Sequence, residues 1–187
     1  MRHFKAIINI VPRSLPFALL AGFLLGTPFG YAQSQAETDS LEQLYLKGAF
    51  KSDDSLEILH RLAVGYQDPQ KVLQYSEALI DAAQRQDSTH RIYQGYLQKG
   101  NGYIRLGNQV DALESYFEAA NYADSTGSVP RLGTTYVTIA DVYSMMDNAE
   151  NAQEYYRRAI GILRKTKDTF SLAVGIANAG DFFYQQG

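Results

Sequence analysis

The chain has 187 residues, with 17 Lys and Arg against 20 Asp and Glu, three His, and no Cys or Trp. This length is enough for one domain with a substantial core. A formal net charge of −3 supplies no basic face, so we expect no nucleic-acid partner. The lack of Cys excludes disulfides, zinc–thiolate sites and a thiol nucleophile.

The N-terminal segment 1–32 predicts an export signal. Arg2, Lys5 and Arg13 are the charged residues of this segment, and the last is followed by the apolar run LPFALLAGFLLGTPFGYA. Such a run, ending in small residues, is typical of a signal peptide. We therefore expect residues 1–32 to be a signal peptide cleaved after Ala32. The alternative is a retained membrane anchor, but glycines and a proline interrupt the roughly 20 apolar residues that a span needs.

From Thr38 onward the sequence predicts helices separated by short turns. Asp and Asn precede the apolar runs as N-caps, notably Asp39, Asp54, Asp68, Asn108 and Asp147. No segment alternates apolar and polar residues as a strand does. We expect an N-terminal segment, 33–54, with a short helix at 39–49, and then an all-α array over 55–187. Its helices are expected at 55–67, 69–85, 89–106, 109–124, 130–146, 148–165 and 170–186.

A forty-residue pattern recurs in this array. In the first helix of each pair, Gly100 returns as Ala140 and Gly180, with an aromatic or Ile four residues before and an aromatic three residues after. In the second helix, Ala112, Tyr116 and Ala119 return as Ala152, Tyr156 and Ala159. Small residues let helices approach closely and large ones fill the gaps, as a stacked array of helix hairpins requires.

These residues resemble the tetratricopeptide repeat (TPR) family. Lys99 departs from the family pattern, which has an aliphatic residue there, and the repeat unit is longer than the common form of the family. The resemblance implies a right-handed superhelical array of antiparallel helix pairs, a TPR-like α-solenoid. It also implies a concave face, lined by the first helix of each pair, that binds a protein or peptide.

The resemblance places candidate partner-binding residues on that concave face. Asn101, Asp141 and Asp181 would form a repeating ladder of polar groups. The alternative is that the same face is simply the solvated surface of a spacer. Leu97 stands where the family's peptide-carboxylate clamp has a Lys, so we expect no receptor for a C-terminal carboxylate. The candidates are Gln94, Leu97, Gln98, Asn101, Arg105, Thr134, Thr138, Asp141, Ser144, Asn178 and Asp181.

No motif for catalysis, a cofactor or a metal is visible in the sequence. His60 and His90 stand alone, without the spacing of a metal pair. Gly100-Asn101-Gly102 lies within a helical pattern and lacks the preceding strand of a phosphate-binding loop. We therefore expect no catalytic, cofactor or metal site and no enzyme within these residues, although a catalytic domain beyond Gly187 is compatible with this.

Exported arrays of this kind resemble the periplasmic sensory regions of Bacteroidetes-type sensor histidine kinases and nucleotide cyclases. The helix at 170–186 has no partner helix, so we expect an N-terminal fragment of a signalling protein. The location would be the periplasm of a Gram-negative bacterium, with a tether to the inner membrane beyond Gly187 and no membrane insertion of 33–187. The alternatives are a free-standing periplasmic scaffold and a homodimer formed through the bare face.

Overall fold

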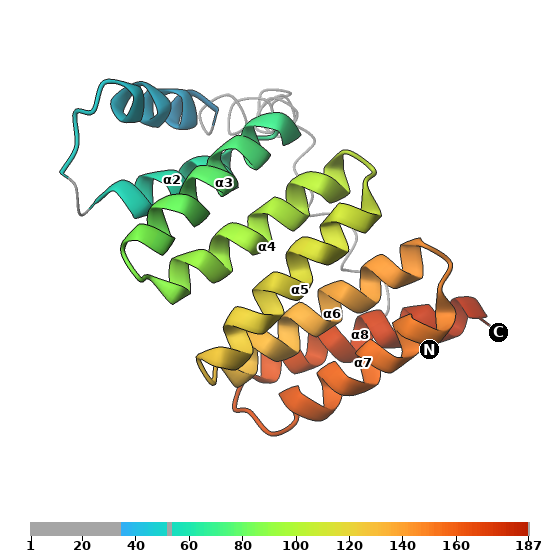
Figure 1. Ribbon diagram of the computed structural model, residues 1–187. Helices are drawn as coiled ribbons and strands as arrows, with labels where there is room; N and C mark the ends of the chain where they lie inside the picture. The colour runs from blue at the N-terminus through green and yellow to red at the C-terminus, as the bar shows by residue number, and fades with distance from the viewer. Residues whose placement is uncertain (1–34, 52–53, 187) are drawn as a thin grey trace, which may run out of the picture.

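The computed structural model describes residues 35–51 and 54–186, so the expected signal peptide lies outside the described residues. The described part is all-helical, as predicted, and contains no strand. Figure 1 shows the helices arranged in successive pairs. After a helix at 35–46, the elements are α2 (Ser55–Gly65), α3 (Pro69–Arg85), α4 (Thr89–Arg105), α5 (Gln109–Ser125), α6 (Val129–Met145), α7 (Ala149–Leu163) and α8 (Thr169–Gln186).

Each of the helices α2 to α8 begins and ends within two residues of its predicted bounds. The first helix is different, because it covers 35–46 where 39–49 was predicted. Asp39 was taken as its N-cap, but Asp39 lies inside the helix. Glu42, taken as the partner of that cap, instead reaches across to Lys71 and Tyr75 of α3. A tertiary contact has therefore overridden the local capping pattern.

The same turn closes α3, α4, α5 and α6. Its central residue has a positive φ, and these residues are spaced by twenty: Asp87, Gly107, Gly127 and Asp147. The next residue donates its backbone N–H to a carbonyl five residues earlier, for example Asn108 to Tyr103 at 2.9 Å. This is the Schellman arrangement of a helix C-terminus. Its regular recurrence gives four successive helices of equal length.

Side-chain hydrogen bonds cap the N-termini of α3, α5 and α7. Asp68 accepts from the backbone N–H of Gln70, with Pro69 at the first helical position, as predicted. Asn108 caps α5 in the same way. The prediction that Asp147 caps α7 is wrong, because the positive φ of Asp147 makes it the turn residue and Asn148 takes the cap. Asp54 makes no capping bond with its side chain.

Small residues stand where the helices approach most closely. A Cβ added to Gly100 would lie 2.7 Å from Cδ1 of Tyr116, so that ring rests directly on the α4 backbone. A Cβ on Gly133 would lie 2.7 Å from Leu163 in the same way. Ala119 and Ala159 are fully buried. The alternation of small and large residues in the sequence therefore fixes the spacing of the helices.

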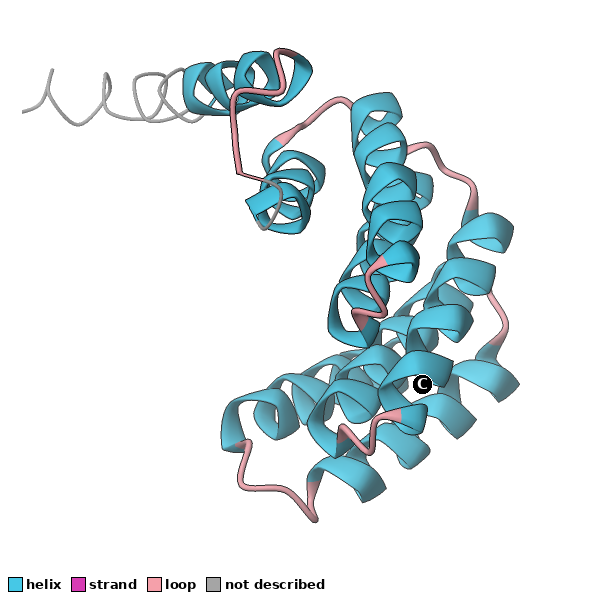
Figure 2. Ribbon diagram, turned by 60° about the vertical axis from the view of Figure 1, so that its left-hand side comes forward, coloured by secondary structure: helices cyan, strands magenta, loops and turns pink. Residues whose placement is uncertain are grey.

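The pairs follow one another along a curved path, and the two ends of the described array differ (Figure 2). At the first end, helix 35–46 packs on the first pair, with Thr38 against Gly65 and Tyr45 edge-on to Tyr75. At the other end, α8 packs on α6 and α7 through one face, which carries Ala179 and the buried Phe182.

Candidate functional site

In the pairs α4–α5 and α6–α7, the second helix sends a tyrosine hydroxyl to the first helix. The Tyr116 hydroxyl donates to Oδ1 of Asn101 at 2.7 Å. One repeat later, the Tyr156 hydroxyl donates to Oδ1 of Asp141. Asn178 of α8 adds its amide, 3.2 and 3.1 Å from the two oxygens of the same carboxylate. We call these five residues the inner row. Their bonds form two sets, one that joins α4 to α5 and one that joins α6, α7 and α8.

Burial controls the acid–base behaviour of the inner row. Desolvation raises the pKa of Asp141, and the hydrogen bonds from Tyr156 and Asn178 oppose that rise. Desolvation likewise raises the pKa of Tyr116, and the charge of Asp141 raises it further. Arg105 acts in the opposite direction on the pKa of Tyr116. The inner row therefore contains one half-buried carboxylate, that of Asp141, whose hydrogen-bond donors are neutral. The charge of Arg105 acts on the hydroxyl of Tyr116.

Of the predicted residues, the structure brings Asn101, Asp141 and Asn178 into this row. Gln98 supports it, because its Oε1 accepts from Nδ2 of Asn101 at 3.1 Å. Arg105 is exposed and donates to the backbone carbonyl of Tyr66 at 2.9 Å. These hydrogen bonds orient the side chains before any partner arrives.

The other predicted residues lie outside the row. Gln94 accepts from Arg91 at 2.9 Å, and Leu97 packs on the core. Thr134 and Thr138 donate their hydroxyls to carbonyls of their own helix. Asp181, the third member of the predicted ladder, is exposed and accepts from Gln185 of its own helix at 2.9 Å. Ser144 is half-buried.

Sequence reasoning treated the repeat tyrosines as core bulk and missed their hydroxyls. Tyr116 and Tyr156 are 40 residues apart, and Tyr75 lies 41 residues before Tyr116; this near-regular recurrence was the available signal. At the first of these positions the acceptor comes from helix 35–46. The Tyr75 hydroxyl donates to Oε1 of Glu42 at 2.5 Å, and Nζ of Lys71 lies 2.8 Å from the same oxygen.

We call Glu42, Lys71, Tyr75 and Tyr66 the Glu42 cluster. The hydrogen bond from Lys71, and then that from Tyr75, lower the pKa of Glu42 to about 2. Lys71 also lies over the Tyr66 ring, with Nζ 4.3 Å from its centroid. This cluster pins helix 35–46 to the first pair by charge and hydrogen bonding as well as by packing.

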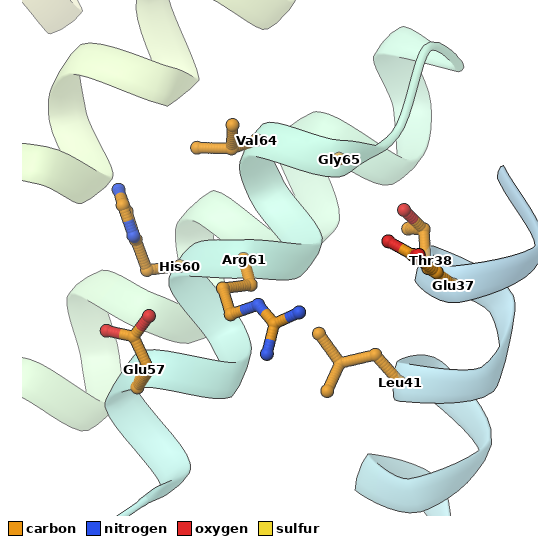
Figure 3. A pocket seen from close by; sticks show the side chains of 8 residues that line it. All are labelled: Glu37, Thr38, Leu41, Glu57, His60, Arg61, Val64 and Gly65. Atoms are coloured by element: carbon orange, nitrogen blue, oxygen red, sulfur yellow. The ribbon is translucent and has the colours of Figure 1, made fainter. Parts of the chain in front are cut away.

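A hollow lies between helix 35–46 and α2 (Figure 3). The Arg61 side chain extends toward Leu41 across it, whereas the Glu57 and His60 side chains of α2 point away from Leu41 in this view. Burial lowers the pKa of His60, which favours the neutral imidazole. Among the described residues, no group of three or more His, Asp and Glu could hold a metal ion. The lining residues are Glu37, Thr38, Leu41, Glu57, His60, Arg61, Val64 and Gly65.

None of the described helices combines the length and the apolar character that a membrane crossing requires. No family model matches the chain. Among curated proteins, the human and mouse "Cell division cycle protein 16 homolog" are each 36% identical to this chain over 70 residues. The matched segment is 37% of this chain, and it spans only 11% of the length of either relative.

Solved structures match over more of the chain. A Pyrococcus horikoshii signal transduction ATPase (STAND protein) with a tetratricopeptide repeat sensor gives a TM-score of 0.65 at 18% identity, over 73% of this chain and 22% of that one. BtubC (BKLC) from P. vanneervenii gives a TM-score of 0.65 at 19% identity, over 83% of this chain and 65% of that one. A structure of Podosopora anserina kinesin-light-chain TPR-like repeats, which are nearly identical to one another, gives a TM-score of 0.68 at 17% identity, over 91% of this chain and 87% of that one. The fold of this chain is therefore a TPR-like repeat solenoid.

Proposed function

We propose that the chain is a protein-binding array that holds a peptide segment of a partner against the inner row. The observation that carries this proposal is two sets of hydrogen bonds at equivalent positions, Tyr116 to Asn101 in one repeat and Tyr156 with Asn178 to Asp141 in the next, which fix the orientation of polar groups in successive repeats. Solenoids use such extended faces for recognition. Because the groups are already oriented, little side-chain entropy is lost when a partner binds.

The charges of the row define the chemistry of the partner. Asp141 and the exposed Asp181 make the α6–α8 part acidic, and Arg105 makes the α4 end basic. A segment that carries hydrogen-bond donors or a cation toward Asp141, and an acceptor toward Arg105, complements this pattern. Complementary charges of this kind determine which partner is selected and how it is oriented.

The wider role that we propose is the exported, periplasmic input region of a signal-transduction protein, such as a sensor histidine kinase or a nucleotide cyclase. Two features support it. Residues 1–32 have the composition of a signal peptide. The STAND protein with a similar fold is described as having its tetratricopeptide repeats as a sensor. The competing proposal is a free-standing periplasmic scaffold.

Substitutions in the row test the binding proposal directly. Asp141→Asn keeps an oxygen for the Tyr156 hydroxyl but removes the charge, and Arg105→Gln removes the nearby cation. The double variant should keep the wild-type unfolding transition and lose cross-linking to the native partner. Gln153→Ala, at an exposed position on α7, is the matched control and should cross-link as the wild type does. Equal cross-linking by the double variant would exclude the inner row as the binding surface.

Cell fractionation tests the wider role. An antibody against residues 33–187 is applied to periplasmic, membrane and cytoplasmic fractions of the source cells. A membrane-associated band much larger than the 20.9 kDa of this chain supports the input-region proposal. A periplasmic band near that mass supports the scaffold, and a cytoplasmic band refutes export.

A further inference from the structure

Two histidines that are far apart in the sequence, His60 and His90, come together in the structure. His60 belongs to α2 and His90 to the first turn of α4, and the charge of His60 acts on the pKa of His90. The charges of Arg91 and Arg131 act on the same imidazole. We call His60, His90, Arg91 and Arg131 the histidine cluster. It gathers basic side chains from α2, α4 and α6, the first helices of three successive pairs.

Both arginines of the cluster are held in place by neighbours. Nη2 of Arg91 lies 2.5 Å from Oε2 of Glu57, and its Nη1 donates to Oε1 of Gln94 at 2.9 Å. The guanidinium of Arg131 lies over the Tyr93 ring, with Cζ 5.5 Å from the ring centroid. A guanidinium stacked on a ring keeps the N–H groups at its edge available as donors. Among the residues that the structure describes, no carboxylate forms an ion pair with Arg131.

The surroundings of the two imidazoles disfavour their protonation. Partial burial lowers the pKa of His90, and the charges of Arg131, Arg91 and His60 lower it further. Burial and then Arg91 lower the pKa of His60, and Glu57 opposes this. The cluster therefore lacks a negative charge that would stabilise both imidazolium ions.

The two charged residues of α2 beside His60 do not supply that negative charge. Glu57 is already paired with Arg91. Arg61 is itself a cation, and its side chain extends away toward Leu41 (Figure 3). A carboxylate from outside the chain would fill this role.

The cluster lies on the same side of α4 as the inner row. His90 and Asn101 are eleven positions apart, which corresponds to about three helical turns and a separation of about 16 Å. An extended segment of about five residues covers that distance. A bound segment can therefore reach from the inner row to the histidine cluster.

We propose that the histidine cluster binds acidic side chains of the partner segment, and that this binding strengthens as the pH falls. The inference rests on the proposed binding function and names the chemistry of one part of the partner. Aspartate or glutamate carboxylates accept from Arg131 and from both imidazoles. A neighbouring carboxylate favours the protonated imidazole, so ligand binding and proton binding reinforce each other.

The probe is fluorescently labelled octa-aspartate, titrated into the full chain and followed by anisotropy. Aspartate has an ordinary pKa of about 3.9, so the probe stays charged over the range in which histidine titrates. Binding should be at least about fivefold tighter at about pH 5.5 than at about pH 7.5. The double variant His60→Gln, His90→Gln should lose this difference. A wild-type affinity that does not change with pH would overturn the proposal, as would no binding at the lower pH.

The arginine is tested against a matched loss of charge. Arg131→Gln should weaken octa-aspartate binding about fivefold at either pH. Lys165→Gln removes the same charge from an exposed position in the turn after α7 and should bind as the wild type does. An equal loss in the two variants would show only a general attraction between charges. Displacement of the probe by a similar concentration of inorganic phosphate would show a small-anion site instead, and would also refute the proposal.

NMR provides a readout that does not depend on these variants. The imidazole resonances of His60 and His90 are titrated with pH in the free chain and with saturating octa-aspartate. Both pKa values should rise when the probe is bound. Unchanged values would place the probe elsewhere on the chain.

Cross-linking to the native partner separates this proposal from the proposed function. At about pH 5.5 the double histidine variant should cross-link less than the wild type. If it cross-links equally while Asp141→Asn with Arg105→Gln does not, the inner row stands and the histidine cluster is wrong. If only the histidine variant loses cross-linking, the cluster stands and the inner row is excluded.

Discussion

Asn101 and Asp141 hold equivalent places and accept the same kind of bond, yet one is neutral and the other is charged. Each receives the hydroxyl of the tyrosine fifteen residues later. Accepting the tyrosine hydroxyl does not require a charge, because the neutral Asn101 also accepts one. Burying a carboxylate costs free energy that hydrogen bonds only partly return. The charge of Asp141 is therefore better explained by binding than by folding.

Two substitutions of Asp141 separate these roles. Asp141→Asn removes the desolvation cost and keeps an acceptor for Tyr156, so the free energy of unfolding should be unchanged or slightly higher. Asp141→Ala leaves the buried Tyr156 hydroxyl without its acceptor and should lower the free energy of unfolding by about 1–3 kcal/mol. Urea titration at pH 7 measures both. An equal loss in the two variants would show that the charge itself stabilises the fold.

The raised pKa of Asp141 gives this residue a characteristic pH dependence. Its folded pKa lies above its unfolded pKa, so the native state binds the proton first as the pH falls. The free-energy cost of burying the charged carboxylate is complete above the folded pKa and falls as the pH drops below it. Relative to Asp141→Asn, the wild type should therefore gain stability as the pH is lowered through that range. Urea midpoints measured across the acid range test this sign.

Glu42 is expected to behave in the opposite way. Its pKa falls from 4.5 to about 2 in the folded chain, so its stabilisation is complete above pH 4.5 and is lost as the pH falls toward 2. Glu42→Gln should cost about 1 kcal/mol at pH 7, because partial exposure of Lys71 weakens the pair. The variant and the wild type should converge near pH 2. Unfolding curves that stay equally far apart at all pH values would contradict this.

At the scale of the element, the recurring turns determine how successive helices connect. Asp147 occupies a left-handed conformation that Gly107 and Gly127 adopt without strain. Asp147→Gly should therefore raise the free energy of unfolding by about 0.5 kcal/mol, and Gly107→Ala should lower it by about 1 kcal/mol. Thermal unfolding of the two variants measures these opposite effects. A destabilised Asp147→Gly would mean that the Asp side chain matters more than its backbone.

The forty-residue pattern was enough to predict the helices α2 to α8 and the array, because each repeat is built from local caps, turns and small–large alternation. Helix 35–46 was misplaced because Glu42 is held by Lys71 and Tyr75 of a different helix, a contact with no local signature. The candidate binding residues were assigned by resemblance to the repeat family. That resemblance predicts which face of the array they occupy, but not which hydrogen bonds their side chains make. The spacing of Tyr116 and Tyr156 was visible, but nothing in the sequence states which way a hydroxyl turns.

At the scale of the molecule, the described contacts link only elements that lie close in chain order, so stability varies along the array. The first end is covered by helix 35–46, and α8 is covered on one face only. Native-state hydrogen exchange should therefore find α8 the least protected of the helices α3 to α8, and α6, which packs on both α5 and α7, among the most protected. Equal protection of α8 and α6 would show a single cooperative unit instead.

The regular turns also determine how such a molecule can change over evolution. Because the left-handed residue recurs every twenty positions, a duplicated or deleted stretch of forty residues that begins at one turn and ends at another leaves every remaining turn intact. A gene encoding this array can therefore gain or lose a pair without disturbing the turns that remain. The number of helix pairs in such an array can therefore change during evolution in steps of one pair.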